Sequence, residues 1–168
     1  MDFVKFYLGT TPDYLGRKLQ ALWRLSDEDL ETGHDFIQVL FPLPERSQAI
    51  PGAPVIDEAA LAEFRDNATI QANLLRSFER MLNFYGFKLD KPRKEVAKAD
   101  DFRRKAENWL FPNDHNHLRI TRMMKCLRAV GLGDYAAAFY RALAPLADPK
   151  HVTAETLRYW QTAADVTA

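Results

Sequence analysis

The sequence predicts an all-α fold, a compact single-domain bundle of roughly six to eight helices. Three observations support this prediction. Apolar residues recur at three- and four-residue intervals along most of the chain, whereas the alternation typical of strands is scarce. The 168 residues suit a single domain covering residues 1–168 and are enough to bury one sizeable core. Apolar residues make up 47% of the chain and charged residues 27%, which is typical of globular rather than disordered proteins.

Charge and cysteine content narrow the class of protein. Lysine and arginine total 23, and aspartate and glutamate also total 23, so no net charge draws the chain to nucleic acid. Cys126 is the single cysteine, which excludes an intrachain disulfide. No run of roughly 20 apolar residues is present, and the N-terminal stretch carries Asp2, so we predict neither a transmembrane segment nor a secretory signal. We therefore expect a cytoplasmic protein without a nucleic-acid partner.

The first helix is predicted over residues 10–25. Thr11 is a candidate N-cap, and Pro12 follows at the first helical position, where its missing N–H costs nothing. The apolar residues that recur at helical spacing are Leu15, Leu19, Leu22 and Trp23. Gly16 weakens this helix by about 1 kcal/mol relative to alanine.

A second helix is predicted to begin at Ser26. Ser26 and Asp29 have the spacing of a capping box, in which each side chain accepts a hydrogen bond from the other residue's backbone N–H. Leu25 and Leu30 have the spacing of a hydrophobic staple, and Gly33 is an expected interruption.

The stretch "HDFIQVLFPLPERS", residues 34–47, is predicted to be helical up to Pro42, because proline lacks a donor and clashes with the preceding turn. The apolar residues on one face of that helix are Phe36, Ile37, Leu40 and Phe41. We favour packing in the core as the role of this face; the alternative is a hydrophobic groove that receives a peptide. His34 is interpreted as a cap or an interior histidine, and residues 46–54 as a loop.

The strongest helical pattern covers residues 57–86, with a break near residues 66–68 and a C-terminal stop at Gly86. Its apolar stripe consists of Ile70, Leu74, Phe78, Met81, Leu82 and Tyr85. The segment 88–105 holds eight basic and four acidic residues, and we predict that its first half is an exposed, solvated loop.

Four more helices are predicted in the C-terminal half. The first begins at residues 99–101 and ends at Trp109 or Leu110; a turn over residues 111–114 follows. The others cover residues 115–130, 134–146 and 153–164, the last with Thr153 as its N-cap. The core stripe of the helix after residue 114 is Ile120, Met123, Met124, Leu127 and Val130.

The densest polar cluster is "NDHNHLRITR", residues 113–122. His115 and His117 are two positions apart and would point to nearly opposite sides of a helix, so we predict no shared metal. His115, Arg119 and Arg122 would share one face near the positive N-terminal end of the helix, which suits a carboxylate or a phosphate. We favour the interpretation that both arginines pair with acids of the domain and orient the helix; the anion site is the alternative.

Signatures of catalysis are not found in the sequence. It contains no nucleophile elbow, P-loop or dinucleotide fingerprint. Cys126 has no base beside it in the sequence and is interpreted as structural. We therefore predict no catalytic residue, no metal and no cofactor.

Three strings in this order, "DFIQVLFPLPE", "RMLNFYGFKL" and "HNHLRITRMMKCLRAVGLG", resemble the conserved N-terminal region of the opioid growth factor receptor family. The resemblance runs from about Tyr14 to Tyr140, in the form of a bacterial-type stand-alone domain. It departs from the family pattern at Val39, where a tryptophan is expected, and at His117, where an asparagine is common. The namesake is a receptor for the enkephalin pentapeptide at nuclear and perinuclear membranes. The resemblance therefore implies a peptide or protein partner and, on this ground alone, peripheral membrane association.

We carry two hypotheses of function. The first is a peptide- or protein-binding module with aromatic walls and a cation for a peptide carboxylate. Its candidate residues are His34, Phe36, Phe41, Phe84, Tyr85, His115, His117, Arg119 and Arg122. The second is an uncharacterised enzyme or a small-molecule sensor that binds an anion or phosphate with the four residues His115, His117, Arg119 and Arg122.

Overall fold

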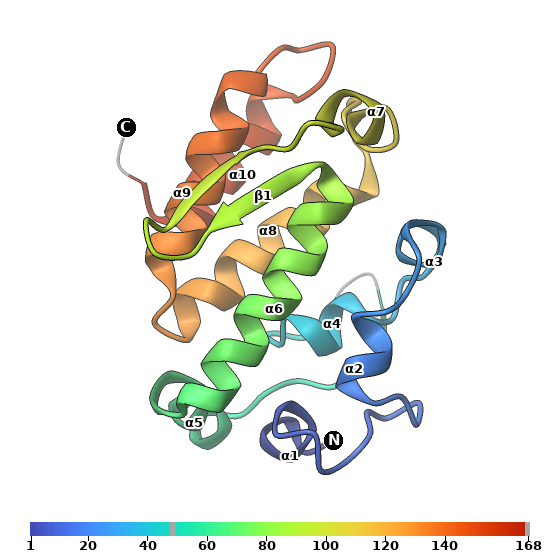
Figure 1. Cartoon of the computed structure of the whole chain (residues 1–168), viewed down its shortest axis with the longest axis vertical. Coiled ribbons are helices and arrows are strands. Elements are labelled where there is room, and N and C mark those ends of the chain that lie inside the picture. Colours follow the sequence, from blue (N-terminus) through green and yellow to red (C-terminus); the bar gives the residue numbers. More distant parts are fainter. Residues whose placement is uncertain (48–49, 167–168) are drawn as a thin grey trace. The chain divides into compact units, whose positions relative to one another are not determined.

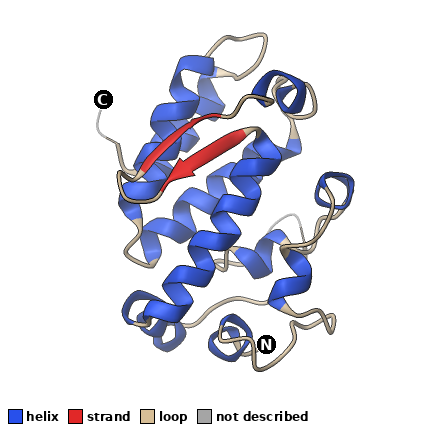
Figure 2. Ribbon diagram, in the orientation of Figure 1, coloured by secondary structure: helices blue, strands red, loops and turns tan. Residues whose placement is uncertain are grey.

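A computed structural model describes residues 1–47 and 50–166. These residues form ten α-helices, one short 3-10 helix and a two-stranded antiparallel hairpin (Figure 1, Figure 2). The chain divides into two compact units, Met1–Arg80 and Met81–Ala168, and the division falls within helix α6 (Ala68–Tyr85). The predicted helical character is confirmed, but the all-α class is corrected by the hairpin. Among the described helices none is both long and apolar enough to cross a membrane.

The first unit contains five short helices and the start of α6. The five are α1 (Phe3–Tyr7), α2 (Leu19–Leu22), α3 (Asp27–Thr32), α4 (Ile37–Leu40) and α5 (Glu58–Asp66). Helix α1 was not predicted; Asp2 caps it, since its Oδ1 accepts a hydrogen bond from the backbone N–H of Lys5 at 2.9 Å. The largest fully buried side chains of this unit are Phe6, Tyr7, Leu19, Phe36, Phe41, Phe64 and Phe78.

The predicted helix over residues 10–25 is wrong in its first half, because only α2 is helical. The cause is Asp13, whose side chain is fully buried. Its Oδ1 accepts hydrogen bonds from the backbone N–H groups of Leu15 and Arg17 at 2.9 and 2.8 Å, and its Oδ2 accepts one from Arg17 Nε at 2.8 Å. A short carboxylate that binds nearby backbone donors competes with the helix for them. Gly16, at φ +82°, completes the tight loop.

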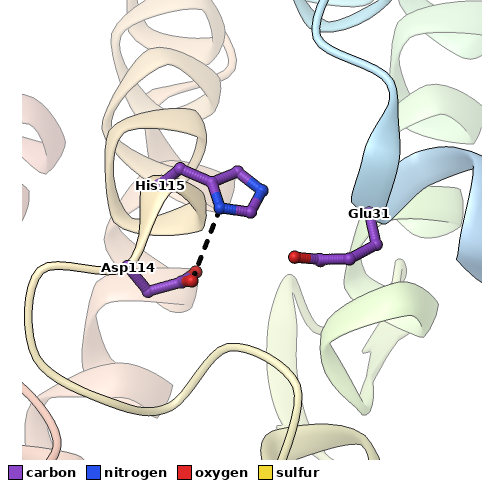
Figure 3. Close-up of side chains that lie close together, drawn as sticks. All are labelled: Glu31, Asp114 and His115. Atoms are coloured by element: carbon purple, nitrogen blue, oxygen red, sulfur yellow. Dashed lines mark ion pairs between the residues drawn. The ribbon is translucent and has the colours of Figure 1, made fainter.

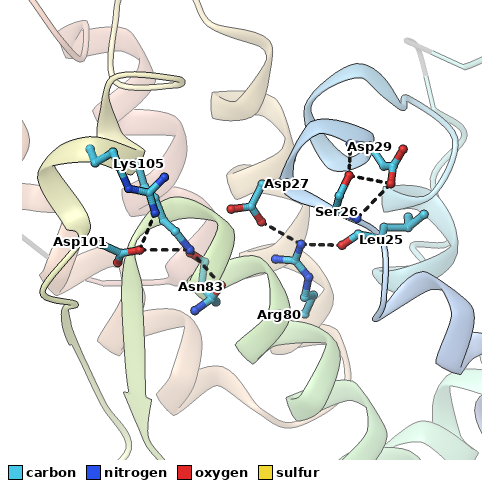
Figure 4. A network of polar contacts seen from close by, with 9 residues as sticks. Leu25, Ser26, Asp27, Asp29, Arg80, Asn83, Asp101 and Lys105 are labelled. Carbon is cyan, nitrogen blue, oxygen red and sulfur yellow. Dashed lines mark hydrogen bonds and ion pairs between the residues drawn. The ribbon is translucent and has the colours of Figure 1, made fainter.

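The capping box of α3 is confirmed. Ser26 Oγ accepts from the backbone N–H of Asp29 at 3.0 Å, and Asp29 Oδ2 accepts from the backbone N–H of Ser26 at 3.0 Å (Figure 4). The helix ends before Gly33, as predicted. Arg80 ties this region to α6, because its Nη2 donates to the carbonyl of Leu25 at 2.7 Å and to Asp27 Oδ1 at 2.8 Å.

The predicted helix before Pro42 is reduced to the single turn α4. All four of its residues are buried, including Gln38, so burial extends around the turn instead of following one face. The flanking rings of Phe36 and Phe41 are also buried, as the packing interpretation expects. Tyr7 donates a hydrogen bond to the carbonyl of Leu40, which joins α1 to α4. The loop predicted over residues 46–54 is confirmed except at residues 48 and 49, which lie outside the described residues.

Helices α5 and α6 confirm the strongest sequence pattern. The break lies at Asn67, whose Oδ1 accepts hydrogen bonds from the backbone N–H groups of Thr69 and Ile70 at 3.0 and 3.2 Å. The predicted stripe of α6 is buried at Ile70, Leu74, Phe78, Met81, Leu82 and Tyr85.

The second unit contains the end of α6, the hairpin and the C-terminal helices. Its elements are β1 (Phe87–Asp90), β2 (Glu95–Lys98), α7 (Phe102–Ala106), α8 (His115–Ala129), α9 (Gly133–Leu143), the 3-10 helix η1 (Ala144–Leu146) and α10 (Ala154–Ala164). Helix α8 packs against α9 and α10, and α9 also packs against β2 (Figure 1). Helices α8, α9 and α10 were predicted, as was the Thr153 cap, which accepts from the backbone N–H of Thr156 at 3.1 Å.

The hairpin corrects the prediction of an exposed loop after residue 88. Gly86, at φ +84°, turns the chain at the end of α6 so that Phe87 is buried and pairs with Lys98. Asp90 Oδ1 accepts a hydrogen bond from the backbone N–H of Arg93 at 3.2 Å, which closes the turn. Each strand has only four residues, several of them charged, which is too few to show the apolar–polar alternation that predicts a strand.

Lys105 on α7 is buried although lysine is normally exposed. Its Nζ donates to the carbonyl and to Oδ1 of Asn83 at 2.6 and 2.9 Å and lies 3.5 Å from Asp101 Oδ2 (Figure 4). The lysine therefore supplies a donor near the C-terminal end of α6, where carbonyls lack helical partners. Helix α7 ends at Ala106, earlier than the predicted Trp109 or Leu110.

Candidate functional site

The polar cluster singled out in the sequence lies at the start of α8 in the second unit. Asn113 adopts a left-handed conformation, φ +63°, and Asp114 then caps the helix. The Oδ1 atom of the buried Asp114 accepts a hydrogen bond from the backbone N–H of Asn116 at 2.9 Å. Its Oδ2 lies 3.5 Å from Nδ1 of His115 (Figure 3). One carboxylate thus caps the helix and places the first histidine.

Asn116 is fully buried and joins two other polar side chains. Its Oδ1 accepts a hydrogen bond from the Tyr85 hydroxyl at 3.3 Å and one from Arg119 Nη1 at 3.0 Å. An amide oxygen has two lone pairs and can satisfy both donors. The amide therefore compensates part of the cost of burying the Tyr85 hydroxyl and the Arg119 guanidinium.

Aromatic residues surround this network. Trp109 Nε1 donates to the carbonyl of Tyr85 at 3.2 Å, and the two rings meet edge to face with centroids 5.3 Å apart. Tyr85 also stacks on Phe139 of α9 at 6.4 Å. The end of α6, the segment after α7 and the helix α9 thus meet at Tyr85.

His115 and His117 diverge, as the helical spacing predicts. Helix α8 begins at His115, so both residues are helical. The His115 side chain is 39% exposed, whereas His117 is buried. Burial lowers the pKa of His117, and the nearby Asp114 carboxylate opposes part of that shift. The two rings cannot converge on one metal ion in this arrangement.

The two arginines occupy the first half of α8. Arg119 is buried, with Asn116 as one of its partners, and Arg122 is partly exposed. Anion binding by the two arginines stays a prediction.

The other candidate residues are distributed over both units. Phe36 and Phe41 are buried in the first unit, where His34 is exposed before α4. Phe84 and Tyr85 are buried in the second unit. The four rings serve as packing residues within their own units, and their use as walls of a peptide site stays a prediction.

Sequence reasoning missed Asn116, Trp109 and Trp160. Asn116 was not among the candidate residues, although it lies between His115 and His117. The available signal was the indole N–H of each tryptophan, which requires an acceptor when the ring is buried. Trp160 Nε1 finds its acceptor in the carbonyl of His117 at 3.0 Å.

The Cys126 thiol is fully buried, and burial raises its pKa to about 12. Since the ordinary value is 9.0, the thiolate fraction falls by about a thousandfold, so we expect iodoacetamide to leave the native protein unmodified near neutral pH. Mass spectrometry should show alkylation only after denaturant is added. Rapid modification of the native protein would contradict the structural role predicted for this cysteine.

Comparison with known proteins gives one consistent result. Residues 1–163 match the opioid growth factor receptor (OGFr) conserved region. The chain is 37% identical to the rat opioid growth factor receptor over 120 residues, which is 71% of this chain and 20% of the relative. The human receptor is 35% identical over 71% of this chain and 17% of its own length, and mouse opioid growth factor receptor-like protein 1 is 33% identical over 65% and 23%. No solved structure matches the chain significantly.

Proposed function

Since the chain belongs to the family defined by the opioid growth factor receptor conserved region, we propose that it is a helical binding module for a peptide or protein partner. The chain spans about a fifth of the length of the rat receptor. A receptor activity of this chain is therefore part of the proposal.

The burial of Cys126, His117 and Asp114 supports binding over catalysis. The His115 side chain, 39% exposed, is an accessible titratable group at the start of α8. Cys126 is buried and its raised pKa disfavours the thiolate, and His117 is buried between aromatic rings. Asp114 and Asn116 are engaged in the helix cap and the internal network. An acid, base or nucleophile must reach a substrate, and these groups face the interior.

The outer face of α8 is the surface that best fits a short peptide. Leu118 is 68% exposed, and Arg122 and Lys125 follow at i+4 and i+7 on the same face. Tyr159 of α10 is 57% exposed, and its neighbour Trp160 is bonded to the carbonyl of His117, so we include Tyr159 in the proposed surface. Apolar and cationic side chains in one place suit a peptide with an aromatic residue and a terminal carboxylate.

Calorimetric titration tests this proposal. The ligand is a pentapeptide of enkephalin type, with an N-terminal tyrosine, an inner aromatic and a free carboxylate. We expect saturable binding heat and an affinity about tenfold lower for Leu118→Ser, whose exposed position leaves folding intact. Arg122→Ala and the C-terminally amidated peptide should each weaken binding if the carboxylate is clamped.

Matched control variants distinguish an error in the proposed binding surface from an error in the proposed function. Val55→Ser removes a 43% exposed apolar side chain of the first unit, and Arg158→Ala removes an exposed charge of α10; both should bind normally. The absence of any saturable heat with wild type would refute the binding proposal for this peptide class. Unchanged affinity in Leu118→Ser and Arg122→Ala would instead remove only the α8 face.

The position of the arginines favours one alternative function, a sensor of phosphate or another small anion. Arg119 lies one turn after the N-terminus of α8, and Arg122 lies at the middle of the helix, so both cations are close to the end where the helix dipole stabilises anions. Thermal shift with inorganic phosphate and nucleotides tests it. Stabilisation that is lost in Arg122→Ala, together with no peptide binding, would favour the sensor.

A further inference from the structure

His117 occupies an unusual place for a titratable side chain. Its ring lies between two indoles, with centroids 6.3 Å from Trp109 and 5.2 Å from Trp160, both in edge contact. Neither ring nitrogen has a hydrogen-bond partner among residues 1–47 and 50–166, although both are buried. Buried polar atoms are nearly always paired, so this histidine is an exception that calls for a physical reason.

The backbone of the same residue holds α10. The carbonyl of His117 accepts hydrogen bonds from Trp160 Nε1 and from Thr121 Oγ1, each at 3.0 Å. The Trp160 indole therefore contacts the His117 ring and also bonds to its carbonyl. A movement of the ring out of its place would displace Trp160, a side chain that joins α10 to α8. A second such side chain is Arg128, whose Nη1 donates to the carbonyl of Thr162 at 3.0 Å; it holds the C-terminal end of α10, so the ring controls the docking of α10 around Trp160.

The charges around the ring are few. Asp114 favours the protonated ring and His115 opposes it, whereas Trp109 and Trp160 are uncharged. The backbone of Trp109 also favours protonation, but no hydrogen bond of normal geometry joins it to the ring. Desolvation is the largest influence and lowers the pKa of His117.

We propose that His117 is a proton-sensitive latch between α8 and α10: the neutral ring stays between the indoles and keeps α10 docked, and the protonated ring leaves and releases α10. This proposal is independent of the ligand-binding function.

The sign of the pH dependence follows from the direction of the shift. The docked state holds the pKa of His117 below its ordinary value of 6.5, and a released, solvated ring returns to that value. The released state therefore binds more protons below pH 6.5. Docking is stable above that pH and weakens as the pH falls through the window beneath it.

Hydrogen exchange of the full-length chain tests the latch. NMR reports the protection of the Trp160 indole N–H and of the α10 amides between about pH 7.5 and about pH 5. After correction for intrinsic exchange, we expect protection to fall by up to about tenfold per pH unit as the pH drops below 6.5, until the lower pKa of the docked His117 ring is reached. The ring protons of His117 should titrate over the same range.

Two variants remove the proton without removing the side-chain volume. In His117→Phe and His117→Gln, protection of α10 should no longer depend on pH in this window. His34→Gln, which removes an exposed histidine of the first unit, should keep the wild-type profile. A wild-type protection that is flat from neutral to acidic pH would overturn the proposal. So would a pH dependence that survives in whichever of the two His117 variants folds.

Discussion

Replacing Gly86 by alanine is expected to lower the free energy of unfolding by about 2 to 5 kcal/mol. Two effects add at this position. The backbone is left-handed, φ +84°, which strains any residue with a Cβ. The new Cβ would also lie 2.8 Å from Cα of Phe102 and 3.2 Å from Cβ of Lys105, so α7 would have to move. Urea unfolding followed by circular dichroism measures the change.

Gly131 provides the matched control for this prediction. It has nearly the same φ, +81°, at the end of α8, but nothing lies within 4 Å of an added Cβ. Gly131→Ala should therefore cost only the backbone strain, about 1 to 2 kcal/mol. If the two variants lost equal free energy of unfolding, the close approach of α7 to Gly86 would be contradicted.

Replacing Asp13 by alanine is expected to destabilise the first unit by about 3 kcal/mol. The fully buried carboxylate accepts hydrogen bonds from two backbone N–H groups and from the guanidinium of Arg17. Alanine would leave those donors unpaired in the loop before α2. Denaturant unfolding monitored by the fluorescence of Trp23, which lies in this unit, would report the loss.

Two conservative variants separate the contribution of the Asp13 charge from that of its hydrogen bonds and from that of the second Arg17 partner. Asp13→Asn keeps an oxygen for the backbone donors but removes the charge, so we expect about half of the loss. Asp35→Asn removes the second partner of Arg17, a carboxylate whose side chain is 43% exposed, and should cost less than about 1 kcal/mol. If Asp13→Ala were as mild as Asp35→Asn, the loop would not depend on the buried carboxylate.

The long helices could be predicted because their pattern is local and repeated. The stripe of α6 from Ile70 to Tyr85 and that of α8 from Ile120 to Val130 extend over several turns. The break at Asn67 could also be predicted, because asparagine readily caps a helix; its side chain accepts hydrogen bonds from the first backbone N–H groups of α6. Spacing alone likewise predicted that His115 and His117 diverge.

The errors lie where a single contact decides the local structure. Periodicity favoured a helix through Asp13, but one carboxylate binds the donors of residues 15 and 17 and prevents it. The hairpin depends on the turn at Gly86 and on the burial of Phe87, neither of which has a repeated pattern.

The interior of the candidate site was hidden for a different reason. Asn116 bonds to Tyr85, 31 residues earlier in the chain, and Trp160 bonds to the carbonyl of His117, 43 residues earlier. Pairings of that range follow from tertiary packing, which the local spacing of polar residues does not encode.

The most direct test of the binding proposal is an NMR titration of the isotope-labelled chain with the free-acid pentapeptide. We expect saturable shifts in the amide signals of Leu118, Arg122 and Tyr159, while Val55 in the first unit stays unchanged. A spectrum that does not change at saturating peptide, or shifts confined to other surfaces, would contradict binding at the outer face of α8.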